Sequence, residues 1–236
     1  MGTWQKPSFR SLLEETDTFI TCVEMVNSRG VIAEREGTRL LKLARELAQN
    51  PRIHALCVTD NAGGNAMLSG ETLGTDLISR GQEVVIHLSC KDRNRNGLQS
   101  QAWKLASEGF NNVLALSGDY PVNGYQGQAS AVFDIDSVGL LKIMSEMNAG
   151  LKIVAGQKKK DQVLKQTSFF LGAVVNNHKQ YEHEVMPQYF KLKKKNENGA
   201  SFIINQIGYD ARKQDELLKY MDWSGLHVSV LANVYV

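Results

Sequence analysis

Carboxyl, imidazole and amide side chains stand at the ends of several short apolar segments of the sequence. Glu24 lies in "TCVEM", His87 in "VVIHLS", Asp119 in "LALSGDY" and Gln206 in "FIINQIGY". A carboxyl group in apolar surroundings has a raised pKa unless a cation pairs with it, and a raised pKa suits a general acid. The amide of Gln206 can donate and accept hydrogen bonds at once. These residue types suit proton transfer and the binding of a polar ligand.

Each of these residues also has a structural explanation. Arg29 follows Glu24 closely enough in sequence to be its ion-pair partner, and the two explanations of Glu24 weigh evenly. A lone strand histidine such as His87 is more often a core residue whose hydrogen bonds are satisfied. The glycines of "VTDNAGGN", after Thr59, fit either a ligand lying against the main chain or a plain loop. No residue is specific alone, so only their convergence would indicate a site.

The segment "QYFKLKKKNENGA" is rich in lysine, and three of its lysines are candidates for binding an anion. Lys191, Lys194 and Lys195 are these residues, and Lys191 and Lys195 share a helix face because they are four positions apart. A solvated face explains them, and so does a phosphate or pyrophosphate group bound there. The charged stretch "GQKKKDQ" at 156–162 has the same two explanations, a solvated loop or an anion site.

Composition narrows the class of protein. The chain has 236 residues, 42% of them hydrophobic, and a net charge of +2, which argues against a general nucleic-acid binder. No apolar run approaches a membrane span and no export signal stands at the N-terminus, so we expect a cytoplasmic protein. The three cysteines, Cys22, Cys57 and Cys90, are widely spaced in apolar segments. They predict reduced buried thiols rather than disulfides or a metal site.

Short apolar segments alternate with helical patterns along the whole chain. We expect strands at Phe19–Glu24, Ala55–Thr59, Glu83–Ser89, Asn112–Ser117, Ser168–Val174, Phe202–Gln206 and Val228–Val234. Helices are expected at Ala33–Gln49, Gly70–Arg80, Asn96–Gly109, Asp136–Asn148, Glu182–Asn198 and Ala211–Trp223. Strands that are apolar on both faces are typical of a parallel sheet covered by helices.

This alternation fits a (β/α)8 TIM barrel or a doubly wound open sheet. The first turn, "EMVNSRGVIAE", has no GxGxxG motif, which favours the barrel over a nucleotide-binding open sheet. We therefore predict one barrel domain over residues 1–236. Only seven strands are found, so we expect that the last β/α unit is missing and that the chain is an excerpt of something longer. The alternative is an eighth strand overlooked around "GLKIVAG".

The longest of these motifs, "HLSCKDRNRNGLQSQAWKLASEGFNNVLALSGDYP" from His87 to Pro121, resembles the methylenetetrahydrofolate reductase family. Members of that family typically have a strand ending in His-Leu-Thr/Ser-Cys, then a helix, then a second strand ending in Gly-Asp. "FITCVEM" resembles the first strand of the family, and "KLKKKNENGASFIINQIGYD" resembles a later segment at about the right distance. The resemblance runs from about Thr18 to Val236.

This resemblance implies a TIM barrel that holds a flavin, usually FAD and in the alternative FMN. The flavin takes a hydride from NADH or NADPH. The flavin passes it to the folate substrate 5,10-methylenetetrahydrofolate, which becomes 5-methyltetrahydrofolate. Matched to the family, Glu24 is the acid that opens the folate ring, Asp119 lies beside flavin and pterin, and Gln206 contacts the pterin. The implied cofactor-binding residues are Thr59, Ala62, His87, Ser117, Gly118, Asp119, Lys191, Lys194 and Lys195.

The chain departs from the family at several flavin positions. Ser117 stands where many members have Arg, Val175 near a frequent Tyr and Gln188 near a frequent Asp. The identity of the flavin is therefore open, and two other functions are kept. One is a folate- or corrinoid-associated binding or methyl-transfer component without redox activity. The other is a flavin subunit reduced by an electron-transfer partner protein. In each case we expect a homo-oligomer.

Overall fold

The computed structural model describes residues 7–124, 127–153 and 162–235. Its centre is a parallel sheet of seven strands whose spatial order follows the chain, β1-β2-β3-β4-β9-β10-β11. These strands are β1 (Cys22–Met25), β2 (Ala55–Val58), β3 (Glu83–Ser89), β4 (Asn112–Leu116), β9 (Phe170–Val175), β10 (Phe202–Asn205) and β11 (Ser229–Leu231). Because the order never reverses, the sheet curls as in a barrel rather than lying open as in a doubly wound fold.

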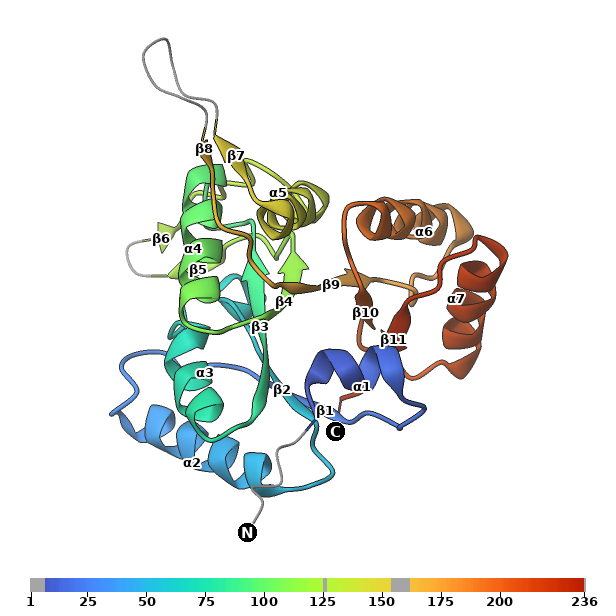
Figure 1. Ribbon diagram of the computed structural model, residues 1–236. Helices are drawn as coiled ribbons and strands as arrows, with labels where there is room; N and C mark the ends of the chain where they lie inside the picture. Colours follow the sequence, from blue (N-terminus) through green and yellow to red (C-terminus); the bar gives the residue numbers. More distant parts are fainter. Residues whose placement is uncertain (1–6, 125–126, 154–161, 236) are drawn as a thin grey trace.

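Helices cover the outer face of this curled sheet (Figure 1). They are α2 (Arg35–Gln49), α3 (Gly70–Ser79), α4 (Arg95–Ser107), α5 (Ser137–Ala149), α6 (Glu182–Glu197) and α7 (Ala211–Trp223). Several begin at a side-chain cap: Asn94 accepts from the Gly97 N–H at 2.9 Å, and Asp136 accepts from the N–H groups of Val138 and Gly139 at 3.0 Å. The (β/α) barrel prediction is confirmed, with seven of its strands in the described residues.

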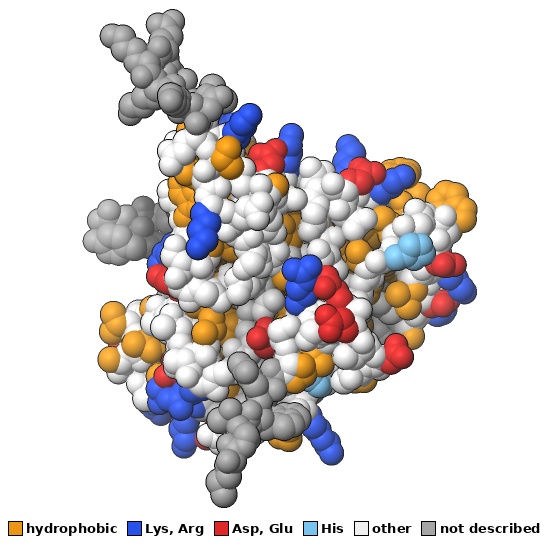
Figure 2. All heavy atoms as spheres, viewed as in Figure 1, with side chains coloured by type: hydrophobic (Ala, Val, Ile, Leu, Met, Phe, Trp, Pro, Cys, Tyr) orange, Lys and Arg blue, Asp and Glu red, His pale blue; other side chains and the backbone are white. Residues whose placement is uncertain are grey.

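A second core fills the inside of the curled sheet. Phe9, from helix α1 (Phe9–Glu15), is fully buried there against the rings of Phe170 and Phe202, at centroid distances of 6.1 and 5.3 Å. Gly172 of β9 leaves room for this cluster, because a Cβ at that position would lie 2.2 Å from the Phe202 ring. Helix α1, which the sequence patterns did not predict, thus packs its first residue into the barrel interior. The surface of α1 is charged: blue and red atoms lie side by side over it in Figure 2, and Arg10 pairs with Glu14 at 2.9 Å.

Each of the seven predicted strands corresponds to an observed one, with ends moved by a few residues. The largest differences are at Phe19–Glu24, where β1 begins only at Cys22, and at Val228–Val234, of which three residues form β11. The alternative eighth strand around "GLKIVAG" is wrong, because Lys152–Ile153 (β7) pairs antiparallel with Gln162–Val163 (β8) outside the main sheet. A second small hairpin joins β5 (Asn123–Gly124) and β6 (Gly127–Gln128).

The charged stretch at 156–162 lies outside the described residues except for Gln162. In the part of the chain that is described, no helix combines the length and apolarity needed to cross a lipid bilayer.

The two edge strands of the sheet, β1 and β11, do not pair with each other. A cavity of about 520 Å³ lies along this open side, lined by residues of α1, of the segment between α1 and β1, and of both edge strands. We call it the lateral cavity; Leu13, Phe19, Cys22, Glu24, Cys57 and Leu231 are among its lining residues.

Candidate functional site

A cavity of about 400 Å³ opens at the carboxyl ends of the strands, and we call it the mouth cavity. Strand and loop residues from around the sheet line it together. Of the residues singled out by sequence, it contains Glu24, Thr59, Ala62, His87, Ser117, Gly118, Asp119, Lys191, Lys195 and Gln206. The carboxyl ends of parallel barrel strands are where the βα loops converge, which is why residues far apart in sequence meet here.

Period-two alternation along the strands brings polar side chains to this end of the interior. In β3, Val85 belongs to the interior core, and His87 and Ser89, two and four positions later, line the mouth cavity. In β1, Glu24 lies two positions after Cys22 and opposite Cys57 of β2. The interior is therefore apolar where α1 enters it and polar at the mouth.

Glu24 faces both the mouth cavity and the lateral cavity. Its side chain is open to these spaces, but the surrounding protein removes enough water to raise the pKa of the carboxyl. Arg29, the partner that one explanation gave it, instead donates to Asn65 Oδ1 at 2.5 Å. No ion pair of Glu24 is found among the described residues. The acid is thus available for a ligand, and its role as proton donor stays a prediction.

His87 is 7% exposed, and its Nε2 atom has no hydrogen-bond partner in the described part of the protein. Burial lowers the pKa of the imidazole to about 4, and the nearby carboxylate of Asp60 opposes this only in part. The ring is therefore neutral at pH 7. Its explanation as a satisfied core histidine is wrong, because one ring nitrogen is buried without a partner at the wall of the cavity. Such an atom is costly unless a ligand completes it.

A polar network that sequence reasoning missed holds the loops beside His87. Asp60 Oδ2 accepts hydrogen bonds from Ser89 N at 2.9 Å, from Ser89 Oγ at 2.8 Å and from Arg93 Nη1 at 3.0 Å. These three hydrogen bonds fix the end of β3 against the loop after β2. Asp60 follows directly after Thr59 at a strand end. A search for polar residues at strand ends, which singled out Glu24, would also have found Asp60.

Lys91 is a second residue that the sequence did not single out. It is 1% exposed and lines the mouth cavity, and its Nζ donates to the carbonyls of Asn61 at 2.9 Å and Asp60 at 3.3 Å. It also pairs with Asp92 Oδ2 at 3.1 Å. Since an ammonium group has three protons, these three acceptors use them all. Lys91 therefore positions the loops and forms a wall of the cavity.

Two of the three predicted lysines reach the site. Lys195 is 6% exposed, and its Nζ donates to the Val174 carbonyl at 2.5 Å. Burial, and then the neighbouring charge of Lys191, lower the pKa of Lys195 to about 8. Lys191 pairs with Asp136 at 2.9 Å. Lys194 is exposed and does not line the cavity, because one residue of helix turns the side chain by about 100°.

The loop after β4 supplies Ser117, Gly118 and Asp119. The Ser117 Oγ accepts from the Ser137 N–H at 3.2 Å, so this side chain holds the start of α5. Gly118 has φ +90, and a Cβ there would lie 2.9 Å from Lys91 Cδ, so no other residue fits without strain. Asp119 is exposed at the cavity wall.

Gln206 follows β10, which β9 separates from Asp119's strand β4 in the sheet. Its backbone N–H donates to the Val175 carbonyl at 2.8 Å, and its side-chain Oε1 accepts from the Ile207 N–H at 3.0 Å. The amide NH₂ has no hydrogen-bond partner in the described part of the chain, so it can bind a ligand. Val175 and Gln188, two positions where the chain departs from the family pattern, also line the cavity.

The donor set of the mouth cavity fits a flavin. The uncharged His87 Nε2, which has no partner among the described residues, suits a polar edge of a heterocyclic ring, and an anionic ligand beside Lys191 and Lys195 would favour the charged form of Lys195. These residues would hold the group if it is bound.

The comparisons with known proteins agree with this architecture. The family model described as methylenetetrahydrofolate reductase matches residues 10–236. An uncharacterized protein from Clostridium thermocellum that binds two copies of 5-methyl-5,6,7,8-tetrahydrofolic acid has a similar structure, with a TM-score of 0.60, 10% identity and coverage of 94% of this chain and 68% of that one. No curated protein sequence matches the chain.

Two enzymes of other chemistry share the fold. Oxaloacetate acetylhydrolase has a TM-score of 0.59 at 12% identity, covering 96% of this chain and 70% of that one. 2,3-Dimethylmalate lyase has a TM-score of 0.55 at 12% identity, covering 95% of this chain and 71% of that one. At such identities the structures show the fold alone, whereas the family model spans nearly the whole sequence. The chain belongs to the methylenetetrahydrofolate reductase family.

Proposed function

We propose that this protein catalyses the flavin-dependent interconversion of 5,10-methylenetetrahydrofolate and 5-methyltetrahydrofolate. The observation that carries the proposal is the presence of Glu24, a carboxyl with a raised pKa and no ion-pair partner among the described residues, in the same cavity as His87, Asp119 and Gln206. Opening the folate ring needs a proton donor, and a carboxyl whose pKa is raised by burial is suited to that role. Family membership supports the same conclusion.

Each residue of the site has a role in this proposal. Glu24 donates a proton to the ring nitrogen whose bond to the methylene carbon breaks, which leaves an iminium ready to accept a hydride. Asp119 and the free amide of Gln206 hold the donor and acceptor edge of the pterin. Lys191 and Lys195 bind the cofactor's phosphates, and the neutral His87 ring hydrogen-bonds its heterocycle. A flavin held by these residues, FAD or FMN, would supply the hydride, with NADH or NADPH as its reductant.

The variant Glu24→Gln tests the central assignment. We expect it to lower the formation of methyltetrahydrofolate by about 10²-fold or more, because a positioned general acid contributes about that much. Reduction of the bound flavin by NADH should stay unchanged, since that half-reaction needs no proton from Glu24. Glu36→Gln, on the outer helix α2, is the control and should behave like the wild type. Equal loss of both half-reactions in Glu24→Gln would contradict the role.

A second candidate is a folate-binding or methyl-transfer component without redox activity. It is favoured by Ser117, whose hydroxyl is used by α5 in place of the arginine frequent in the family, and by the folate-binding structural neighbour. A third is a flavin subunit that a partner protein reduces. The visible spectrum of the purified protein separates these: a colourless protein that still binds methyltetrahydrofolate supports the second. A yellow protein that methyltetrahydrofolate bleaches but NADH and NADPH do not supports the third.

A further inference from the structure

Asn233 follows strand β11 on the face that lines the barrel interior. In β11, the Ser229 Oγ donates to the Leu13 carbonyl of α1 at 2.9 Å, and Leu231 packs against the interior core. Asn233 comes two positions after Leu231, so the same alternation directs its side chain inward. It lines the mouth cavity and also the lateral cavity, as Glu24 does.

The backbone of Asn233 is fixed at both of its polar groups. Its N–H donates to Asn205 Oδ1 at 2.6 Å, and its carbonyl accepts from the Gly208 N–H at 3.1 Å. Asn205 is 2% exposed, and its Nδ2 donates to Gln214 Oε1 at 2.6 Å and to Asn177 Oδ1 at 3.3 Å. A buried side chain with several partners therefore holds Asn233 in place.

The side-chain amide of Asn233 is free, in contrast to its backbone. Neither its donor nor its acceptor has a hydrogen-bond partner in the described part of the chain, and the residue is half-buried. Asn176 lines the mouth cavity too, but its Oδ1 already accepts from the His178 N–H at 3.2 Å. A free amide on a fixed backbone suits ligand binding, because little conformational freedom is lost when the ligand binds.

The register of the sheet sets this amide beside that of Gln206. Ile204 of β10 pairs with Leu231 of β11, so two residues farther on Gln206 is level with Asn233. Neighbouring parallel strands are about 4.8 Å apart, which lets two amides at one level bind the same edge of one ring. The two residues therefore form a pair of adjacent amides at the mouth.

We propose that Asn233 is a ligand-binding residue of the mouth cavity that holds, together with Gln206, the pterin ring of the folate. This assignment rests on the proposed function. A reduced pterin has ring N–H and amino donors next to a carbonyl acceptor along one edge, and two adjacent amides match such a row of groups. Because Asn233 and Glu24 line the same two cavities, the ring lies in the space that the proposed acid faces.

The test measures binding to the purified full-length protein by isothermal titration, without turnover. The two probes are 5-methyltetrahydrofolate and 6-methyltetrahydropterin, which has the pterin ring but no benzoylglutamate tail. We expect Asn233→Ala to weaken the binding of both by about three- to ten-fold, the effect of one lost hydrogen bond. Its urea midpoint should equal that of the wild type, because the contacts that fix Asn233 are made by its backbone. Asn96→Ala, at an exposed position of α4, is the control and should bind both probes like the wild type.

A double variant tests whether the two amides share one ring. If Asn233 and Gln206 bind the same edge, their effects are coupled. The loss of affinity in the double variant Gln206→Ala, Asn233→Ala should then be at least about two-fold smaller than the product of the two single losses. Losses that multiply would assign the two amides to separate groups of the ligand and overturn the shared ring.

The outcomes separate this assignment from the proposed function. Unchanged affinity in Asn233→Ala, or weaker binding of the folate but not of the pterin, would overturn the role of Asn233. If the wild type binds the folate through Asn233 but forms no methyltetrahydrofolate with any reductant, the proposed redox activity fails and the binding residue stands. A wild type that binds neither probe would contradict both.

Discussion

Glu24 and His87 are titratable residues of the mouth cavity, and their pKa values shift in opposite directions for the same reason. Loss of water disfavours whichever form is charged, so burial raises the pKa of the Glu24 carboxyl and lowers that of the His87 imidazole to about 4. Both shifts favour uncharged side chains. A neutral acid can give up a proton, and a neutral imidazole can hydrogen-bond a ring without adding charge.

The pH dependence of turnover follows from the direction of the Glu24 shift. A general acid works only while protonated, so the rate of the folate step should fall as pH rises through the raised pKa of Glu24. In Glu24→Gln the small residual rate should be flat across that range. The check is the pH profile of the folate half-reaction, measured with the cofactor already reduced. A profile in the variant that falls as in the wild type would assign the titration to another group.

His87 should make the fold sensitive to acid. The imidazole has a pKa of about 4 in the folded protein and 6.5 in the unfolded chain. The stability that depends on a neutral His87 is therefore fully present above pH 6.5 and is lost as pH falls toward 4. The difference corresponds to about 3 kcal/mol in the free energy of unfolding. His87→Gln removes the titration, and urea unfolding at pH 7 and pH 4.5 should show a smaller loss in the variant. Equal losses would mean that water or a ligand satisfies the ring in solution.

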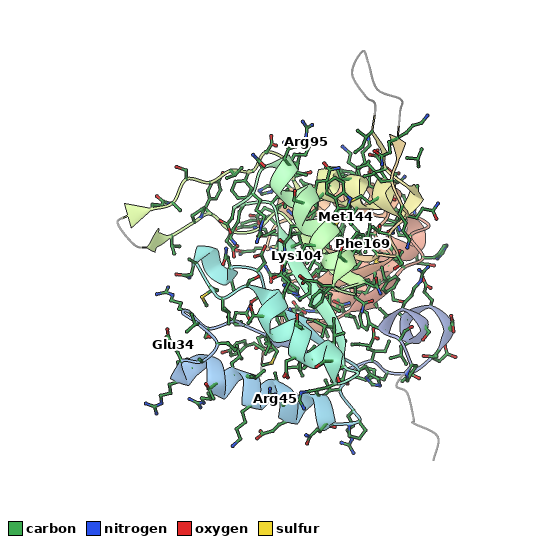
Figure 3. The ribbon with its side chains drawn as sticks, turned by 60° about the vertical axis from the view of Figure 1, so that its left-hand side comes forward. Glu34, Arg45, Arg95, Lys104, Met144 and Phe169 are labelled. Carbon is green, nitrogen blue, oxygen red and sulfur yellow. The ribbon has the colours of Figure 1, made fainter. Side chains whose placement is uncertain are left out.

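At the level of the secondary-structure elements, a buried polar contact joins helices α3 and α4. Glu71 of α3 is 6% exposed and accepts hydrogen bonds from Ser69 and from Gln101 and Lys104 of α4, the last at 3.1 Å. Figure 3 shows Lys104 on α4, on the side of α3. Burial acts to raise the pKa of Glu71, but the hydrogen bonds from Ser69 and Lys104 outweigh it, so the pKa is lowered.

Removal of the carboxyl should loosen this pair of helices. Glu71→Ala is expected to lower the free energy of unfolding by about 2 kcal/mol at pH 7, because it leaves buried donors unpaired. Part of the Glu71 contribution should vanish in acid, since a carboxyl of lowered pKa stabilises the fold above its ordinary pKa and loses that effect as pH falls. Glu108→Ala is the control: Glu108 also pairs with Lys104, at 3.3 Å, but is 41% exposed. It should cost less than about 0.5 kcal/mol, and equal costs would refute the argument.

For the whole molecule, α1 is the element that fills the interior. Phe9 is fully buried between Phe170 and Phe202, although α1 is short and precedes every strand. Phe9→Ala should lower the free energy of unfolding by about 3–5 kcal/mol through lost contacts and the cavity it leaves. Phe19→Ala, at a residue that is 89% exposed, should change it by less than about 0.5 kcal/mol. Denaturant unfolding measures both, and a small effect of Phe9→Ala would mean that α1 does not hold the interior.

The sequence alone determined the order and type of the main elements, the barrel class and the residues at the strand ends. It could do so because apolar periodicity and strand-end polarity are local properties of the chain. The same local rules misjudged what depends on distant partners. Arg29 lies five positions after Glu24 but donates a hydrogen bond to Asn65, and Lys194 belongs to the same run of lysines as Lys191 and Lys195 but does not line the cavity.

Only the tertiary structure decided which polar groups are buried and which are left without a partner. The isolated ring nitrogen of His87 and the buried ammonium of Lys91 each depend on residues that are far apart in sequence and are brought together by the sheet and its loops. The burial and the hydrogen bonds of a side chain depend on neighbours from several strands, so a local sequence pattern does not predict them. The sequence therefore identifies the polar residues of the mouth cavity, whereas the fold sets the protonation states of their side chains.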